Sequence, residues 1–197
     1  MDKLILTDVD GVLLDWENHF HAWMHSQGHQ RAHDVSSYWQ EAHYPGLAAD
    51  EAKKAVYHFN TSAWMIGVPS FKDARSGVAR LVDEGYRFRA ITAMGTDPYS
   101  LQVRKINLEH IFGYGTFEKV IATDMYDPNS KYANLYEYYG QSIPWIEDKP
   151  ENAQLGHDLG LDSYLLRHPH NEGYKIDPGI TCVDNWSQIC DFILGTD

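Results

Sequence analysis

Two aspartates, Asp8 and Asp10, directly follow a short apolar run at residues 4–7. Such a run closed by Gly11 predicts a buried strand that ends in a turn. Side chains two residues apart on a strand share a face, so the two carboxylates can converge on one point beyond the strand. Burying carboxylates is costly unless a cation or a substrate uses them. The spacing therefore predicts a metal-binding or catalytic site at the end of this strand.

Further polar residues end or follow the later predicted strands. Thr92 ends the second strand, Lys131 stands after a loop at the start of the helix that follows the third, and Glu147 and Asp148 follow the fourth. In a parallel sheet the carboxyl ends of the strands meet at one edge, where α/β proteins bind ligands. Carboxylates suit a hard cation such as Mg²⁺, and a lysine with a hydroxyl complements phosphoryl oxygens. Each residue taken alone could be an ordinary strand, turn or helix-start residue, and only their order favours a shared site.

Strand-like and helix-like segments alternate from residue 70 onward. The predicted strands cover residues 4–7, 86–92, 117–122, 143–146, 163–166 and 180–183. The predicted helices cover residues 70–84, 98–110, 130–139, 150–159 and 186–194. Repeated strand–helix–strand order predicts a mostly parallel sheet with helices on both faces. The predicted fold class is therefore α/β, with a Rossmann-like three-layer core.

Residues 16–69 interrupt this alternation. They contain no clear strand pattern, and they favour three helices, at residues 16–27, 36–42 and 49–59. We therefore predict a small α-helical cap inserted after the first strand. The predicted domains are a core formed by residues 1–15 and 70–197, and a cap formed by residues 16–69.

The predicted cap is rich in aromatic residues and histidines. Most of its tryptophans are expected to form the core of the cap, but Trp16 and Phe20 follow the first turn closely and are the candidates for facing a substrate. Four histidines recur every four residues: His21, His25, His29 and His33. One helical face of such residues could bind a transition metal, although Gly28 favours an ordinary polar face or a loop. His168 and His170 precede the loop at residues 173–179, which is expected to be a surface connection.

The composition limits the kinds of molecule that the protein is expected to bind. The formal net charge of −12 over 197 residues disfavours a nucleic-acid polymer. No apolar run approaches the roughly 20 residues that span a bilayer, and residues 1–3 lead straight into a strand, so we expect a cytoplasmic protein without a membrane partner. Cys182 and Cys190 are expected to be free, buried thiols. The sequence leaves the oligomeric state open.

The motifs, in this order, resemble those of the haloacid dehalogenase-like (HAD) phosphohydrolase superfamily. The resemblance rests on DVDGV at 8–12, Thr92 in AIT, Lys131 in NSK and EDKPEN at 147–152, and it covers the whole predicted core. Within this superfamily, the segment DGVLLDW at 10–16 resembles helical-cap members similar to the cytosolic 5′(3′)-deoxyribonucleotidases. One departure is the glutamate of EDKPEN, because the family often has two aspartates or Gly-Asp there.

The resemblance implies a role for each residue in phosphoryl transfer. Asp8 would be the nucleophile that forms an aspartyl-phosphate. Asp10 would protonate the leaving oxygen and then activate water for hydrolysis. Thr92 and Lys131 would bind the phosphate of the substrate, and Lys131 would also offset the charge of the nucleophile.

The resemblance also implies a Mg²⁺ cofactor. The ion would be held by Asp8, by the backbone carbonyl of Asp10 and by Asp148. Glu147 would contact the metal through water or hold its ligands in place, and Asn152 would orient Asp148.

The expected function is a Mg²⁺-dependent phosphatase for a small phosphorylated substrate. Among such phosphatases, the resemblance favours a 5′-nucleotidase. The enzymatic alternatives are a sugar-phosphate phosphatase and a phosphomutase or phosphotransferase. The alternative from another class is a binding module that holds a phosphate ester without turnover. The intact Asp10 disfavours this last alternative, because a carboxylate beyond the nucleophile makes the aspartyl-phosphate hydrolysable.

Overall fold

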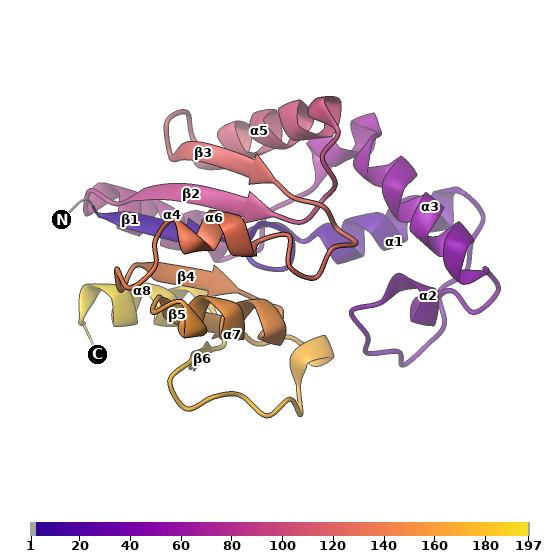
Figure 1. The fold of residues 1–197 in the computed structure, drawn as a ribbon. Coiled ribbons are helices and arrows are strands. Elements are labelled where there is room, and N and C mark those ends of the chain that lie inside the picture. Colours follow the sequence, from indigo (N-terminus) through magenta and orange to yellow (C-terminus); the bar gives the residue numbers. More distant parts are fainter. Residues whose placement is uncertain (1–2, 197) are drawn as a thin grey trace.

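A six-stranded sheet forms the centre of the computed structural model, which describes residues 3–196 (Figure 1). Every pair of neighbouring strands is parallel, in the order β3-β2-β1-β4-β5-β6. The strands are β1 Leu4–Thr7, β2 Arg87–Thr92, β3 Phe117–Ala122, β4 Pro144–Glu147, β5 Asp162–Leu166 and β6 Thr181–Val183. Because β1 pairs with both β2 and β4, the residues that follow β1 lie between the ends of these two strands.

Helices cover both faces of this sheet (Figure 1). They are α4 Ala74–Asp83, α5 Pro98–Phe112, α6 Tyr132–Tyr136, α7 Pro150–Asp158 and α8 Trp186–Leu194. Ile5 and Ile146 lie in the buried cluster that includes residues of α4, α5 and α8. Their neighbours Leu6 and Trp145 point to the opposite face, where they meet residues of α6 and α7. The result is a three-layer core, which confirms the predicted α/β, Rossmann-like fold class.

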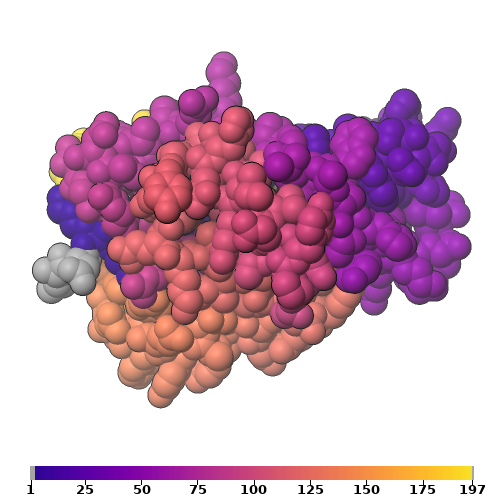
Figure 2. Space-filling model, turned by 90° about the horizontal axis from the view of Figure 1, so that it is seen from above, coloured from indigo at the N-terminus to yellow at the C-terminus, as the bar shows by residue number. Residues whose placement is uncertain are grey.

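The insertion after β1 consists of helices and connecting loops. Its elements are α1 Trp16–Ser26, α2 Gln40–His43, α3 Ala49–Asn60 and the 3₁₀ helix η1 Ala63–Gly67. Figure 1 shows α1, α2 and α3 beyond one end of the sheet, and Figure 2 shows the indigo-to-purple segment gathered at that end of the molecule. This is the segment that we predicted to be a cap.

Both connections of the insertion leave the core side by side. The backbone N–H of Asp15 donates to the carbonyl of Pro69 at 2.9 Å, and that of Phe71 donates to Leu13 at 3.0 Å. Leu14 and Ser70 form an antiparallel β-bridge between these two bonds. Because the chain is extended here, the helix predicted from residue 70 begins only at α4.

Two other local predictions differ from the structure. The helix predicted for residues 36–42 is reduced to the four residues of α2, because the backbone at Trp39 is extended. η1 was not predicted, and its short apolar sequence carries no helical periodicity. Cys182 and Cys190 are both free, as expected; Cys190 is also buried, whereas Cys182 is only partly buried. Among residues 3–196, no helix combines the length and the apolar composition that crossing a membrane requires.

The packing of α7 on the sheet generates a stability prediction. A Cβ atom at Gly156 would overlap Cδ1 of Trp145 and Oγ of Ser163. We expect Gly156→Ala to lower the free energy of unfolding by about 1–3 kcal/mol. Alanine is favoured over glycine in a helix by about 1 kcal/mol, but the cost of overpacking the core outweighs this gain. Gly46→Ala is the matched control, since no atom lies within 4 Å of its Cβ position. Urea denaturation measures both, and a stabilised Gly156→Ala protein would contradict the prediction.

Candidate active site

The turn after β1 positions the first two acidic side chains. The backbone N–H groups of Leu13 and Leu14 both donate to the carbonyl of Val9, at 2.8 and 2.9 Å. Gly11 adopts a φ of +83°, a conformation that side chains rarely tolerate. This tight turn carries Asp8 and Asp10 at the carboxyl edge of the sheet.

A buried lysine joins Asp8 to the end of β4. The Nζ atom of Lys131, which directly precedes α6, lies 3.0 Å from Oδ2 of Asp8 and 2.6 Å from Oε1 of Glu147. Lys131 and Glu147 are 2% and 0% exposed, so solvent screens these contacts little. Burial alone would lower the pKa of Lys131, but the charges of Asp8 and Glu147 raise it above its usual range.

Glu147 is held on both oxygens by the protein itself. Its Oε2 accepts hydrogen bonds from the backbone N–H groups of Asp148 and Lys149, each at 2.8 Å. Its Oε1 accepts one from Nδ2 of Asn152 at 2.7 Å, in addition to the contact with Lys131. Asn152 was expected to orient Asp148, but its hydrogen bond goes to Glu147. Glu147 therefore orders the backbone around Asp148 and the ammonium group of Lys131.

Asp148 lies against the turn after β1. A Cβ atom at Gly11 would overlap the Asp148 carboxylate, so the backbone of the turn approaches this side chain as closely as a glycine permits. Asn171 donates to the carbonyl of Asp148 at 2.7 Å and fixes its backbone from the other side. The Nε2 atom of His170 lies 3.2 Å from Oδ2 of Asp148.

These side chains form a site with an excess of negative charge. Carboxylate oxygens of Asp8, Glu147 and Asp148 lie within 4.8 Å of one another. Burial raises the pKa of Asp8 well above its usual value; Lys131 opposes the shift, and the neighbouring carboxylates add to it. Oδ1 of Asp8 is buried and has no hydrogen-bond partner among the described residues.

The donor set fits one divalent cation. The edge carries four carboxylates, those of Asp8, Asp10, Glu147 and Asp148, against the cations Lys131 and Arg104, with the imidazole of His170 beside Asp148. The carboxylates therefore outnumber Lys131 and Arg104 at this edge. Oxygen donors that include the buried Oδ1 of Asp8, which accepts no hydrogen bond from the part of the chain that the structure describes, suit a hard cation such as Mg²⁺. The residues present therefore fit the expected metal. Asp8 and Asp148 each have one oxygen in contact with a basic side chain, that of Lys131 and that of His170, whereas both oxygens of Glu147 accept hydrogen bonds from the protein.

Asp10 is contacted from α5 by an arginine that sequence reasoning missed. The Nη2 atom of Arg104 lies 2.7 Å from the Asp10 carboxylate. Burial raises the pKa of Asp10, and the charge of Arg104 opposes that rise. The sequence of α5 carries no signal for this contact, because it is the packing of the helix that buries Arg104 beside Val103, Asn107 and Leu108.

One cavity of about 670 Å³ joins these residues. The predicted site residues among its lining are Asp8, Asp10, Trp16, Thr92, Lys131, Asp148 and Asn152. Thr92 is 1% exposed and ends β2, beside the turn. Glu147 lies beneath the cavity wall and is fully buried. The structure thus gathers the strand-end residues at one place, as their order predicted.

Phe20 does not face the cavity, contrary to our expectation. It is fully buried and stacks behind Trp16, with ring centroids 4.8 Å apart. Its spacing from Trp16 places both residues on the same face of α1, but Trp16 occupies the end nearer the sheet. The indole Nε1 of Trp16 donates to Oδ1 of Asn60 at 2.9 Å, which fixes this ring between α1 and α3.

Aromatic residues from the insertion form the opposite wall. Tyr38 and Trp39, in the loop before α2, both line the cavity and are 44% and 56% exposed. Nζ of Lys149 lies 4.6 Å from the centre of the Tyr38 ring and 5.3 Å from that of Trp39. These cation–π contacts join the insertion to the core directly beside Asp148. They depend on loop packing and have no signal in the sequence.

Two histidines in the segment after β5 also reach the site, although sequence reasoning assigned them no role; the 173–179 loop that follows is largely exposed. His168 and His170 line the cavity, and Nε2 of His168 lies 2.6 Å from the carbonyl of Gly11. The two imidazoles stack, with their centroids 5.4 Å apart. The segment that carries these histidines therefore supports the turn after β1.

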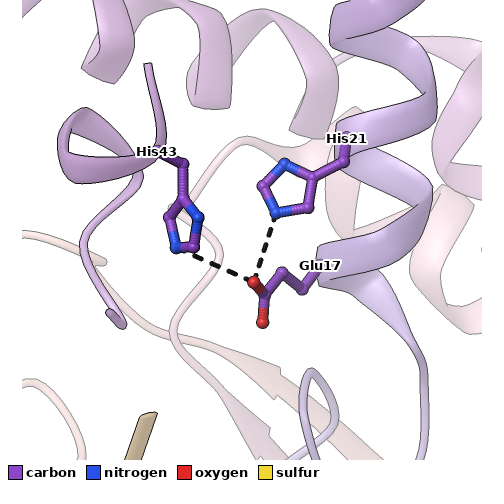
Figure 3. A group of neighbouring side chains, drawn as sticks. All are labelled: Glu17, His21 and His43. Carbon is purple, nitrogen blue, oxygen red and sulfur yellow. Dashed lines mark hydrogen bonds and ion pairs between the residues drawn. The ribbon is translucent and has the colours of Figure 1, made fainter. Parts of the chain in front are cut away.

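A second polar cluster, made by Glu17, His21 and His43, lies within the insertion (Figure 3). Nε2 of His21 and of His43 lie 3.2 and 3.8 Å from Oε1 of Glu17. Nε of Arg31 donates to Nδ1 of His43 at 3.2 Å, so the ring proton of His43 resides on Nε2, which lies 2.7 Å from the carbonyl of Ser37. Burial lowers the pKa of His43, which favours the neutral ring.

This cluster is built as a hydrogen-bond network. Both ring nitrogens of His43 are in use, and Arg31 places a cation 3.1 Å from Glu17. The network ties the loop that carries Tyr38 to α1. The four-residue histidine series does not form one face, because α1 ends at Ser26, before His29 and His33.

The close approach of the turn to Asp148 generates a binding prediction. Gly11→Ala places a methyl group on the Asp148 carboxylate, so we expect the affinity for Mn²⁺ or Mg²⁺ to fall by at least about tenfold. Gly28→Ala is the control, since Gly28 has a similar φ of +89° but open space around it. Titration calorimetry and Mn²⁺ paramagnetic resonance measure the binding. Unchanged affinity in Gly11→Ala would show that Asp148 holds no metal.

No protein-family model matches the chain. An uncharacterized 32.4 kDa protein of Enterobacteria phage T4, from the Gp30-rIII intergenic region, is 30% identical over 177 residues. The match covers 86% of this chain and 60% of the phage protein, so the chain spans about three fifths of its curated relative.

Solved structures share the whole fold at low sequence identity. D,D-heptose 1,7-bisphosphate phosphatase from B. bronchiseptica, solved with magnesium and phosphate, is 12% identical, with a TM-score of 0.60 over 99% of each chain. A HAD family hydrolase from Deinococcus radiodurans R1, solved with phosphate and sodium, is 15% identical, with a TM-score of 0.62 over 99% of this chain and 96% of that chain. Together with the strand order and the strand-end motifs, these likenesses show that the chain has the fold of the haloacid dehalogenase-like superfamily.

Proposed function

We propose that this protein is a Mg²⁺-dependent phosphatase that hydrolyses a small phosphate monoester through an aspartyl-phosphate. One observation carries the proposal: Asp8 sits at the base of the cavity, paired with the buried Lys131, with Asp10 two residues further on. The heptose bisphosphate phosphatase that shares the fold was solved with magnesium and phosphate, which supports the same ligands here.

Asp8 is the nucleophile of the first step. One of its oxygens forms a bond to phosphorus while the bond between phosphorus and the leaving oxygen breaks. Asp10, in its protonated form, gives its proton to that oxygen, so the alcohol leaves uncharged. The enzyme then carries the phosphoryl group on Asp8, and Asp10 is an anion.

Water completes the reaction. Asp10 takes one proton from the water, whose oxygen bonds to phosphorus as the bond from phosphorus to Asp8 breaks. Inorganic phosphate is released, Asp8 is a free carboxylate again, and Asp10 is protonated for the next cycle. One ester and one water have become one alcohol and one phosphate.

Lys131 and Thr92 bind the phosphoryl group during both steps. The ammonium group of Lys131 lies 3.0 Å from Asp8, so a phosphoryl group bonded to Asp8 comes within its reach. The hydroxyl of Thr92, at the end of β2, adds a neutral donor. Positioning and charge neutralisation of this kind are the main catalytic contributions in phosphoryl transfer.

The expected metal would be held by Asp8, by the backbone carbonyl of Asp10 and by Asp148. When bound, Mg²⁺ supplies positive charge that offsets the negative charge of the phosphoryl oxygens and of the nucleophile. Glu147 and Asn152 hold the backbone of Asp148 and the ammonium group of Lys131 for this arrangement.

The insertion is proposed to act as a cap, residues 16–69, that selects the leaving group and excludes bulk water. Five aromatic side chains line the cavity: Trp16, Tyr38 and Trp39 from the insertion, with Phe71 and Tyr126 from the core. Flat aromatic walls favour a flat group on the substrate, since stacking on a nucleobase contributes about 1–3 kcal/mol per base. A volume of about 670 Å³ is within the range of small-molecule sites. We therefore propose a nucleoside monophosphate, and thus a 5′-nucleotidase activity.

The nucleophile has a direct test. We expect Asp8→Asn to abolish phosphate release while the protein stays folded, because the amide lacks the charge and nucleophilicity of the carboxylate. Phosphate release is measured with Mg²⁺ in excess, and circular dichroism reports the fold. Asp83→Asn, at the exposed end of α4, is the control and is expected to keep full activity. Turnover by Asp8→Asn with Mg²⁺ present would refute the mechanism.

The substrate class has a separate test. We expect faster phosphate release from nucleoside and deoxynucleoside monophosphates than from sugar phosphates, and loss of all release when EDTA removes the metal. Trp39→Ala is expected to raise KM for the nucleotides more than for sugar phosphates. A preference for sugar phosphates would assign a sugar-phosphate phosphatase, transfer to a second hydroxyl would assign a phosphomutase or phosphotransferase, and binding without release would assign a binding module.

A further inference from the structure

Arg104 is a buried cation with an acidic partner at the active site. Its side chain is 0% exposed, and Nη2 lies 2.7 Å from each oxygen of Asp10, with its hydrogen bond directed to Oδ2. Among the described residues, Asp10 is the one carboxylate within ion-pair distance of this guanidinium. A buried guanidinium keeps its charge, so its place in the fold depends on this carboxylate.

The other nitrogens of Arg104 make this pairing unusual. Nε and Nη1 are buried and have no hydrogen-bond partner among the described residues. An arginine that served only to connect elements would be expected to share its planar fork among several acceptors. Here the guanidinium is directed at a single side chain, the one proposed to move the proton.

The helix that carries Arg104 is firmly anchored. The N-terminus of α5 is capped by Asp97, whose Oδ1 accepts from the backbone N–H of Ser100 at 2.8 Å. One turn beyond Arg104, Nδ2 of Asn107 donates to the carbonyls of Ile66 and Val68, at 2.9 and 3.0 Å. The same helix therefore holds Asp10 and the chain that returns from the insertion.

We propose that Arg104 is a positioning residue for Asp10. It fixes the Asp10 carboxylate in the orientation that delivers the proton to the leaving oxygen and later collects one from water. Asp10 lines the cavity, while Arg104 does not and reaches it from the side of α5. Arg104 therefore acts on the reaction through Asp10 alone. The inference rests on the proposed phosphatase function.

A double-mutant cycle tests whether Arg104 acts through Asp10. The proteins are wild type, Arg104→Met, Asp10→Asn and the double variant, in which both charges are absent. We expect Arg104→Met to lower kcat by about 100-fold with little change in KM, since a misplacement of about 1 Å has that effect. In the Asp10→Asn background, we expect the same substitution to change kcat by less than about twofold.

The dependence of the rate on the leaving group gives a second readout. A purely structural role of Arg104 would not change this dependence. An alkyl phosphate needs a proton on its leaving oxygen, whereas p-nitrophenyl phosphate releases a weakly basic phenolate that does not. We therefore expect Arg104→Met to keep a fast burst of p-nitrophenolate and to lose the first step with alkyl phosphates. Arg104→Lys, which retains a cation, is expected to recover part of the activity.

The control is Arg80→Met. Arg80 also lies 2.7 Å from an aspartate, Asp191, but this pair is 42% and 33% exposed and lies on the α4–α8 face. We expect full activity from this variant, and thermal unfolding establishes that each protein is folded.

The outcomes separate this inference from the function on which it rests. No phosphate release by wild type overturns the proposed function, and the role of Arg104 with it. Two results with an active wild type would overturn the role of Arg104 alone. One is a kcat of Arg104→Met within twofold of the wild-type kcat. The other is an equal loss of kcat from Arg104→Met in the wild-type and Asp10→Asn backgrounds. Failure of every Arg104 variant, including the neutral double variant, to fold would assign Arg104 to stability and would also overturn the inference.

Discussion

The buried ammonium group of Lys131 holds the acidic edge of the sheet together. It lies 3.0 Å from Asp8 and 2.6 Å from Glu147, and it is almost fully shielded from water. Removing one partner of a buried ion pair costs about 3–5 kcal/mol, so the turn after β1 and the end of β4 both depend on this contact. The loop that carries Lys131 from β3 into α6 is therefore as much a part of the site as the strand ends.

Two kinds of structure meet at the cavity, and they carry different tasks. The core side is built from strand ends and a glycine turn, with short hydrogen bonds that fix the turn after β1, the Glu147 carboxylate and the backbone at Asp148. The other side is built from the rings of Trp16, Tyr38 and Trp39, which belong to the insertion and offer shape more than charge. Under the proposed function, the chemistry belongs to the core side of the cavity and recognition belongs to the insertion.

The sequence was sufficient to predict the sheet and the residues at its edge. Thr92, Lys131 and Asp148 were found because parallel strands bring their carboxyl ends together, which is a consequence of topology. Arg104 and His168 were missed because their contacts depend on how a helix and a loop pack, and periodicity does not report that. Phe20 was misplaced for a related reason: spacing gives the face of a helix, but not which residue on that face reaches the opening.

The paired connections of the insertion have an evolutionary consequence. Backbone hydrogen bonds join Asp15 to Pro69 and Leu13 to Phe71, so the chain leaves the core and returns to it at neighbouring points. The stretch between them can lengthen, shorten or be replaced, and the sheet still closes beneath it. Selection can therefore remodel the mouth of the cavity while the acidic edge is inherited unchanged, so a new specificity does not require a new catalyst.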